Sequence, residues 1–313
     1  MWWVPSFLIS MFSYEKLSKR PSIFKSFSGL EVSEFDSLYA KVESKYVQFE
    51  CERLSVRKDR KRKIGAGRPF KLPVRDRLLM LLVYYRLYVT FTLCGYLFDV
   101  DQATVFRDMR ILEPLVKECI PLPEKIYAAS RRARTPQEIE TYFPGFIAFI
   151  DGTEQEIPRP KNKAKRKSHY SGKKKRHTVK TQLTVNKKGL IVHRTNHARG
   201  RRHDYDVFKQ NHPTLPPGVK PGVDLGYDGI QNDFPKLNAL IPFKKRGSIK
   251  KLTEEQRLFN KQLASARVVV EHTISRLKKF RIMGDEFRNR PKQYDRMSNI
   301  VCGLINIRIL GKA

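Results

Sequence analysis

Residues 145–151, GFIAFID, form a short apolar run that ends in an acid, and this pattern predicts a buried strand. Downstream, residues 177–185 alternate between polar and apolar side chains, and residues 189–195 follow a Lys-Lys-Gly turn, so the two segments predict a β-hairpin. Another short strand is expected at 239–243, and a long amphipathic helix at 254–280. These elements predict an α/β fold with a mixed sheet for the C-terminal half of the chain.

The preceding region, residues 67–120, predicts helices instead of strands. Residues 74–87 are rich in good helix formers, and residues 91–98 form a second, short helix with Thr90 as its expected N-cap. After a turn at 99–101, an amphipathic helix follows. A short helix, a tight turn and an amphipathic helix are the pattern of a helix-turn-helix.

The third helix of this region has two distinct faces. It begins after Asp101, which we expect to cap it, and Val105, Met109 and Leu112 recur as a buried stripe. The outward face then carries four residues able to contact bases and phosphates: Gln102, Thr104, Arg107 and Arg110. Most amphipathic helix pairs are packing units only, and that alternative stays open, although the basic composition favours DNA binding.

Composition changes divide the chain into four expected parts. These are a helical arm with a basic linker (1–66), the helix-turn-helix region (67–120), a linker rich in Pro, Arg and Ser (121–144), and the mixed-sheet domain (145–313). The basic run at 57–63 is interpreted as a solvated linker. The alternative is an extended arm in a DNA minor groove.

The net charge points to a polyanionic partner. The 313 residues hold 63 Lys and Arg against 31 Asp and Glu, which gives a net charge of +32, and 40% are hydrophobic, enough for a core. Nucleic acid is the usual partner of such a chain, whereas the alternative is a merely solvated basic surface. No run of about 18 apolar residues is present, so a membrane span is not expected. The apolar start at residues 1–12 lacks the features of a signal peptide and is interpreted as an extension or a short buried arm.

The cysteines argue against a disulfide framework or a zinc finger. Four are present, at positions 51, 94, 119 and 302, and no two form a C-x-x-C pair. This usage is typical of reduced thiols in a cytosolic or nuclear compartment.

Three acids stand out in a chain that is poor in acids. Asp151 follows an apolar strand, Asp224 ends the segment PGV and precedes LGYDG, and Glu271 lies within the long helix after three valines. A single strand-end Asp is more often a turn cap. Three such acids favour a carboxylate cluster around divalent cations, because Mg²⁺ prefers oxygen ligands and two ions can activate an attacking oxygen and stabilise a leaving one.

Glu271 shares one helix face with two cations. Arg267 precedes it by four residues and Lys278 follows it by seven. One interpretation is an exposed ion-pair ladder. The interpretation favoured by the strand-end aspartates is that Glu271 binds metal while Arg267 and Lys278 hold DNA phosphates.

A basic loop follows Asp151 along the chain. Residues 159–177 contain ten Lys or Arg and no acid, which predicts a clamp on a phosphate backbone. The expected DNA contacts are Lys173, Lys174, Lys175 and Arg176. Tyr170 and His177 would be able to stack on unpaired bases. The alternative is a disordered, solvated loop.

Five segments in this order resemble the DDE transposases of bacterial insertion sequences, with greatest similarity to the IS-Five family, which is related to the Harbinger group. The segments are GFIAFIDGT, SGKKKRHTVKTQL, GRRHDYDVF, VDLGYDG and RVVVEHTISRLK. The resemblance implies an RNase H-like catalytic domain with Asp151 on the first strand, Asp224 after the fourth and Glu271 on a late helix. It also implies two Mg²⁺ ions, for which Mn²⁺ can substitute.

The resemblance further implies a function and partners. The helix-turn-helix would bind the terminal inverted repeats, and the catalytic domain would cleave phosphodiester bonds and join the 3′-hydroxyl to target DNA. Two double-stranded ends imply a homodimer or a higher synaptic assembly, acting in the bacterial cytoplasm at the nucleoid. A DNA-binding regulator or a plain endonuclease of the same fold remains an alternative, and a basic RNA-associated protein would explain the charge but not the ordered acids.

Two positions bear on how far the family pattern extends. Relatives carry a Tyr three residues before the helix Arg, and this chain has Ala264 there. His203 and Asp204 match a His-Asp pair of the family. Asp204 either supports the metal site or caps the short helix that follows, and we favour capping or shaping of the pocket.

Overall fold

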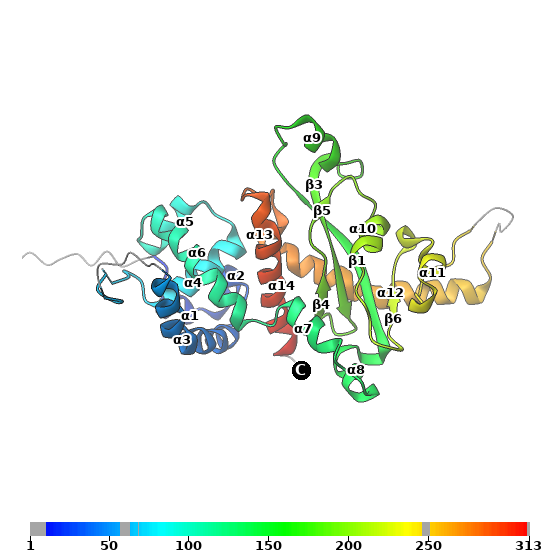
Figure 1. Ribbon diagram of the computed structural model, residues 1–313, viewed down its shortest axis with the longest axis horizontal. Coiled ribbons are helices and arrows are strands. Elements are labelled where there is room, and N and C mark those ends of the chain that lie inside the picture. Colours follow the sequence, from blue (N-terminus) through cyan, green and yellow to red (C-terminus); the bar gives the residue numbers. More distant parts are fainter. Residues whose placement is uncertain (1–10, 57–62, 68, 246–250, 312–313) are drawn as a thin grey trace, which may run out of the picture. The chain divides into compact units, whose positions relative to one another are not determined.

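A computed structural model describes residues 11–56, 63–67, 69–245 and 251–311 (Figure 1). The chain forms two compact units. The N-terminal unit comprises Met1–Ile120 and Phe280–Ile282, and the C-terminal unit comprises Pro121–Lys279 and Met283–Ala313. Most of the basic run at 57–63, together with residues 1–10, lies outside the described residues, so the interpretation of these segments stays a prediction.

The N-terminal unit is helical, as the sequence predicted. Its main helices are α1 (Tyr14–Ser18), α2 (Pro21–Ser28), α3 (Val32–Ser55), α4 (Val74–Leu87), α5 (Phe91–Phe98) and α6 (Gln102–Cys119). Helix α4 is central, because every residue from Arg77 to Tyr85 is buried and the helix contacts α2, α3 and α6. The helix predicted at 74–87 therefore has the predicted bounds.

A buried ion pair joins α4 to α6. Arg77 Nη2 lies 3.0 Å from Asp108 Oδ1, and the two side chains are only 1% and 3% exposed. Arg77 also donates a hydrogen bond to the Tyr46 hydroxyl over 2.6 Å and lies 3.7 Å above the Phe70 ring. An unpaired charge would be costly at this depth, so the pair fixes the position of α6 against α4.

The turn between α5 and α6 is tight. Thr90 caps α5 as predicted, since its hydroxyl accepts a hydrogen bond from the Leu93 amide. A β-carbon at Gly95 would lie 2.3 Å from the Val100 carbonyl oxygen, so only glycine allows this approach. Asp101 occupies the N-cap position of α6 but makes no side-chain capping bond, and the predicted cap is in this respect wrong.

The C-terminal unit contains the predicted mixed sheet. Its longer strands are β1 (Ile147–Glu156), β3 (Arg176–Asn186), β4 (Ile191–Arg194) and β6 (Lys220–Gly222), and two short ones are β2 (Tyr170–Ser171) and β5 (Ala198–Arg199). Strand β3 pairs antiparallel with β1, β2, β4 and β5, whereas β6 pairs parallel with β1. The β3–β4 hairpin is as predicted. The strand expected at 239–243 is reduced to a single bridge between Leu240 and Gly222.

Helices cover this sheet (Figure 1). Helix α12 (Glu254–Lys278) contacts β1 and β3, α14 (Tyr294–Leu310) contacts β4, and α10 (Asp204–Asn211) contacts β3. The smaller elements are η1 (Pro144–Phe146), α9 (Lys163–His169), η2 (Leu225–Tyr227), α11 (Ile230–Asp233), η3 (Pro235–Leu237), α13 (Arg281–Gly284) and η4 (Pro291–Gln293).

The segment 121–144, predicted as a linker, belongs to this unit. It forms α7 (Pro123–Ser130) and α8 (Pro136–Tyr142), and it contributes Ile126, Ile139 and Phe143 to a core cluster. Each proline begins its helix, at the position where the missing amide is tolerated, so the proline content does not indicate a linker here.

The thiols of Cys51, Cys94, Cys119 and Cys302 are all free. Over the described part of the chain, no helix is long and apolar enough to span a membrane.

Candidate active site

The parallel register of β1 and β6 brings two of the predicted acids together. Ile147 pairs with Lys220 and Phe149 with Gly222, so paired residues differ by 73 in number. Asp151 and Asp224 differ by the same 73: Asp151 lies on β1 and Asp224 lies two residues past the end of β6. The negative charge of Asp224 raises the pKa of Asp151, so the two acids lie near each other. The sequence predicted that the strand ends at Asp151. In the structure β1 continues to Glu156.

Asp151 is a desolvated carboxylate. Its Oδ1 accepts a hydrogen bond from the Gly152 amide over 2.7 Å, and its Oδ2 lies 3.8 Å from Arg267 Nη2 of α12. Burial raises the pKa of Asp151 to about 6, the negative charges of Asp224 and Asp204 raise it too, and the Gly152 amide and Arg267 oppose the rise. A carboxylate in these surroundings gains from a nearby cation.

Asp224 combines the role of a turn cap with its place beside Asp151. It precedes η2, and its Oδ1 accepts a hydrogen bond from the Gly226 amide over 2.9 Å. The turn-cap alternative for a single Asp therefore applies here. It also fixes the orientation of the carboxylate, which still interacts electrostatically with Asp151.

A buried tyrosine and a glutamine lie beside the acids, and sequence reasoning assigned neither of them. Burial raises the pKa of Tyr227 well above its ordinary value, and the charges of Asp204, Asp151 and Asp224 add to this rise. Gln182 of β3 donates hydrogen bonds to the Tyr227 hydroxyl, over 3.0 Å, and to the Asp204 carbonyl. Tyr227 belongs to the quoted VDLGYDG segment, but only the fold shows that it lies within range of all three carboxylates.

Asp204 lies close to the strand that carries Asp151. A β-carbon at Gly152 would come within 2.9 Å of Asp204 Oδ1, so the glycine makes room for this carboxylate. Lys180 of β3 lies between two acids, 3.3 Å from Asp204 Oδ1 and 3.4 Å from Glu154 Oε1. His203 holds the N-cap position of α10 without a side-chain capping bond. This arrangement favours pocket shaping over helix capping for Asp204.

Glu271 lies on an exposed part of α12, between two cations that interact with Asp151. Arg267, 11% exposed, makes the ion pair described above. Burial lowers the pKa of Lys278, the positive charge of Lys174 lowers it further, and the charges of Glu154 and Asp151 raise it. Among the described residues, no hydrogen bond or ion pair joins Glu271 to Asp151 or Asp224.

Comparison with known proteins identifies the family. A family model described as "DDE superfamily endonuclease" matches residues 150–306, and a second, "Helix-turn-helix of DDE superfamily endonuclease", matches residues 70–122. The chain belongs to the DDE superfamily endonucleases. The expected resemblance and the helix-turn-helix followed by a mixed-sheet domain are thereby confirmed.

Two relatives of this DDE endonuclease cover most of its length. One, named "Probable transposase for insertion sequence element IS702", from Microchaete diplosiphon, is 33% identical over 82% of this chain and 89% of the relative. The other, named "Putative transposase for insertion sequence element IS112", from Streptomyces albus G, is 23% identical over 86% of this chain and 88% of the relative. No solved structure matches the chain.

The acids of this DDE endonuclease fit a hard divalent cation in their chemistry. Asp151 of β1 and Asp224, just past the end of β6, offer carboxylate oxygens, and burial that raises the pKa of Asp151 leaves its negative charge poorly solvated. Within the described ranges, no three His, Cys, Asp or Glu side chains are already grouped closely enough to hold a metal ion. The two aspartates would thus hold the ion first, and Glu271 would have to approach it.

The predicted DNA-contacting residues of α6 are placed on its outer side with one exception. Gln102, Arg107 and Arg110 are exposed, whereas Thr104 is half-buried. The Thr104 hydroxyl accepts a hydrogen bond from Arg107 Nη2 over 3.3 Å, and the Gln102 side chain accepts one from the Thr92 hydroxyl over 3.0 Å. The buried stripe of the same helix is as predicted.

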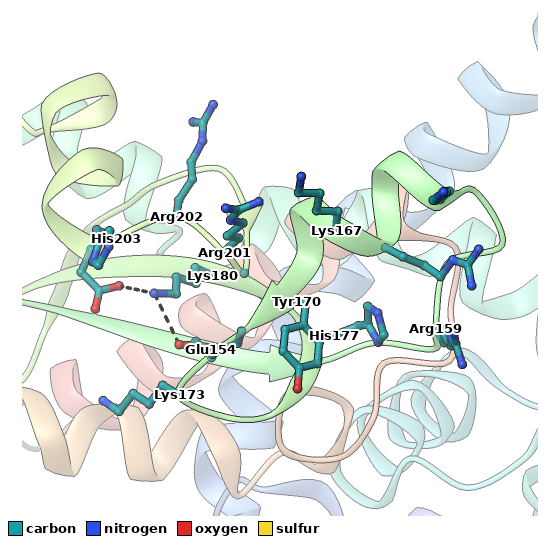
Figure 2. Close-up of a pocket in the computed structure, with 16 residues that line it drawn as sticks. Glu154, Arg159, Lys167, Tyr170, Lys173, His177, Lys180, Arg201, Arg202 and His203 are labelled. Atoms are coloured by element: carbon teal, nitrogen blue, oxygen red, sulfur yellow. Dashed lines mark hydrogen bonds and ion pairs between the residues drawn. The ribbon is translucent and has the colours of Figure 1, made fainter.

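The basic loop of this DDE endonuclease has regular structure. Helix α9 is followed by β2, which pairs with the start of β3, and the Lys175 amide closes the turn by donating to the Ser171 carbonyl over 2.8 Å. Lys173, Lys174 and Lys175 are exposed, as is Arg176. The loop therefore presents its charges from a folded hairpin, beside the pocket drawn in Figure 2.

Proposed function

We propose that this DDE superfamily endonuclease is the transposase of an insertion sequence, which cuts DNA at the ends of the element and joins the freed 3′-hydroxyl to target DNA. One observation carries the proposal: Asp224, just past the end of β6, lies near Asp151 of β1, and Arg267, one helical turn before Glu271, reaches Asp151. The names of both relatives support the same function.

Asp151, Asp224 and Glu271 would hold two Mg²⁺ ions, or Mn²⁺ in their place. Such ions, when bound, activate the attacking oxygen and stabilise the leaving oxygen of a phosphodiester. Asp151 and Asp224 provide oxygens whose orientations are fixed by the Gly152 and Gly226 amides. Arg267 and Lys278 bracket Glu271 on the same helix face and would bind the phosphates that flank the one being cut.

The helix-turn-helix would recognise the terminal inverted repeats through Gln102, Thr104, Arg107 and Arg110. Because Thr104 is hydrogen-bonded to Arg107, we expect it to orient that guanidinium and to have less contact with DNA. Pairing of two ends would require a homodimer or a higher assembly. Replacing Arg107 by Ala should abolish end-specific footprints, and unchanged footprints would reduce α6 to a packing helix.

The deciding experiment is cleavage of a DNA fragment that carries the ends of the element encoding this chain. Wild type should cleave and join in Mg²⁺, and Asp224→Asn should lose cleavage by several orders of magnitude while still binding DNA. Asp206→Asn is the matched control, because Asp206 is exposed on α10. Equal cleavage by wild type and Asp224→Asn would contradict the proposal. Cleavage without joining would indicate a plain endonuclease, and binding without cleavage a DNA-binding regulator.

Metal binding is testable without activity. Mg²⁺ titrated into the DNA-free protein should raise its melting temperature, because a ligand that binds only the folded state stabilises it by mass action. The rise should be lost in Asp224→Asn and kept in Asp206→Asn. A rise of the same size in all three proteins would place the bound ion elsewhere.

A further inference from the structure

A basic pocket lies next to the carboxylates on the face where Asp204 meets β1. It encloses about 1130 Å³, and only two of its lining side chains are acidic, Glu154 and Asp204. The cations that line it come from three segments: Arg159, Lys163, Arg166, Lys167 and Lys173 from the basic loop, Lys180 from β3, and Arg201 and Arg202 from the loop before α10. In Figure 2, Lys167, Arg201 and Arg202 lie on one side of Tyr170 and Lys173 on the other. A cavity of this volume and charge suits a phosphodiester chain better than a small apolar ligand.

The walls of the pocket are held by backbone contacts. The Gly200 amide donates to the Thr178 carbonyl over 3.0 Å, and the Arg201 amide donates to the Ser168 carbonyl over 3.3 Å. A β-carbon at Gly200 would lie 2.0 Å from the Thr178 hydroxyl and 2.7 Å from the His169 carbonyl. The loop before α10 is therefore fixed against β3 and α9, so the pocket exists before any ligand enters it.

Two aromatic rings line this otherwise charged pocket. Tyr170 and His177 are cross-strand partners of β2 and β3, with ring centroids 5.7 Å apart and an interplanar angle of 71°. Tyr170 is 43% exposed, so its ring is available to a ligand. Proteins that bind single-stranded nucleic acid stack unpaired bases on exposed aromatic rings that lie among cationic side chains.

The pocket has an acidic end and a basic end. Lys180 contacts both Glu154 and Asp204 at the acidic end, as the dashed lines of Figure 2 show. Asp204 in turn approaches Gly152 and interacts electrostatically with Asp151. A DNA strand whose phosphate is held at Asp151 would thus continue past Lys180 toward Tyr170 and the cations of the basic loop.

We infer that this pocket receives unpaired nucleotides of the DNA strand adjacent to the phosphate that is cut, with a base stacked on the ring of Tyr170, which meets His177 edge to face. The inference rests on the proposed function for the position of that phosphate. A base paired within a duplex keeps its faces stacked on its neighbours and has none to offer Tyr170, so the pocket selects ends that are frayed or opened. Helix opening at the cleavage site is then assisted by the enzyme.

The test compares two DNA probes on the full-length protein, in EDTA so that no cleavage occurs. One is a fluorescent blunt duplex, and the other is the same duplex with an unpaired single-stranded extension at one end. Wild type should bind the extended probe about tenfold or more tightly than the blunt one, as expected from base stacking. Tyr170→Ala should lose most of this preference and Tyr170→Phe should keep it, with blunt-duplex affinity changed less than about twofold in both.

Phe243→Ala serves as the control, because Phe243 is an exposed aromatic residue outside this pocket. Equal affinity of wild type for the two probes would overturn the inference, as would an equal loss of both affinities in Tyr170→Ala, which would indicate backbone contact alone. If wild type shows no preference between the probes but Asp224→Asn abolishes Mg²⁺-dependent cleavage, this inference is overturned while the proposed function stands. If wild type prefers the extended probe but does not cleave the DNA ends in Mg²⁺, only the proposed function is contradicted.

Discussion

Arg267 Nη2 lies 3.8 Å from Asp151 Oδ2, so the late helix α12 reaches the strand carboxylate one helical turn before Glu271. Glu271 is therefore about 6 Å farther along the same helix face, at a rise of 1.5 Å per residue. In the absence of metal the guanidinium provides the positive charge beside a desolvated Asp151. A divalent ion at this site would provide the same compensation, which leaves Arg267 available to a phosphate.

The charge of Asp151 costs the metal-free protein stability. Its pKa is about 6 in the folded state against an ordinary value of 3.8, so above pH 6 the desolvated carboxylate lowers the free energy of unfolding by up to about 3 kcal/mol. The penalty disappears as pH falls from 6 toward 4, because the folded protein then takes up the proton first. We predict that Asp151→Asn melts at a higher temperature than wild type at pH 8 and at the same temperature near pH 4. Equal melting at pH 8 would show that Asp151 is better solvated than its burial indicates.

Arg267 should set the pH at which that penalty reaches its full size. Its guanidinium lowers the pKa of Asp151, so replacing it by Met should raise this pKa above 6. In an Arg267→Met background, the stabilising effect of Asp151→Asn should therefore still begin near pH 4, but it should keep growing to a higher pH and be larger at pH 8. The measurement is a series of thermal melts from pH 4 to pH 9 without metal. Lys261→Met provides the control, since Lys261 is exposed on the same helix.

The close approach of Asp204 to Gly152 predicts a sensitive position. Gly152→Ala would put a β-carbon 2.9 Å from Asp204 Oδ1, closer than such atoms normally come, so the carboxylate and Lys180 must shift. We expect cleavage to fall by at least tenfold while binding of a DNA end changes little. The double variant Gly152→Ala, Asp204→Ser removes the clash. If it is no better than Gly152→Ala alone, the effect of the alanine lies in β1 itself and not in the displaced carboxylate.

Periodic segments of this chain were predictable from the sequence, whereas the interactions among the site residues were not. The helix at 74–87 and the β3–β4 hairpin carry strong local patterns and form as expected. The apolar run predicts a strand that ends at Asp151, because such a run cannot show that the strand continues through Gly152, Glu154 and Gln155. These polar residues are satisfied by partners distant in sequence, such as Lys180 for Glu154 and the Asp285 carbonyl for Gln155.

The sequence separation of Asp151 and Asp224 reflects one feature of the site geometry. The separation of 73 between Asp151 and Asp224 is the register of β1 with β6, but no local pattern in either segment states that the two strands pair. The roles of Tyr227 and Gln182 depend on three elements meeting, and no single motif predicts this. Composition misled at 121–144, since prolines at the starts of α7 and α8 resemble those of a linker.

The buried pair of Arg77 and Asp108 should control the stability of the N-terminal unit. With both side chains almost fully buried at 3.0 Å, removing one partner strands a charge in the core, which typically costs about 3–5 kcal/mol. We therefore expect Arg77→Met and Asp108→Leu to lower the unfolding midpoint in urea strongly when made singly. The double variant should recover much of the loss, because two apolar side chains leave no buried charge. Lys71→Met, which removes an exposed pair with Asp99, should change the midpoint little. A double variant less stable than either single one would mean that the contacts of Arg77 with Tyr46 of α3 and with Phe70, and not its ion pair with α6, stabilise this unit.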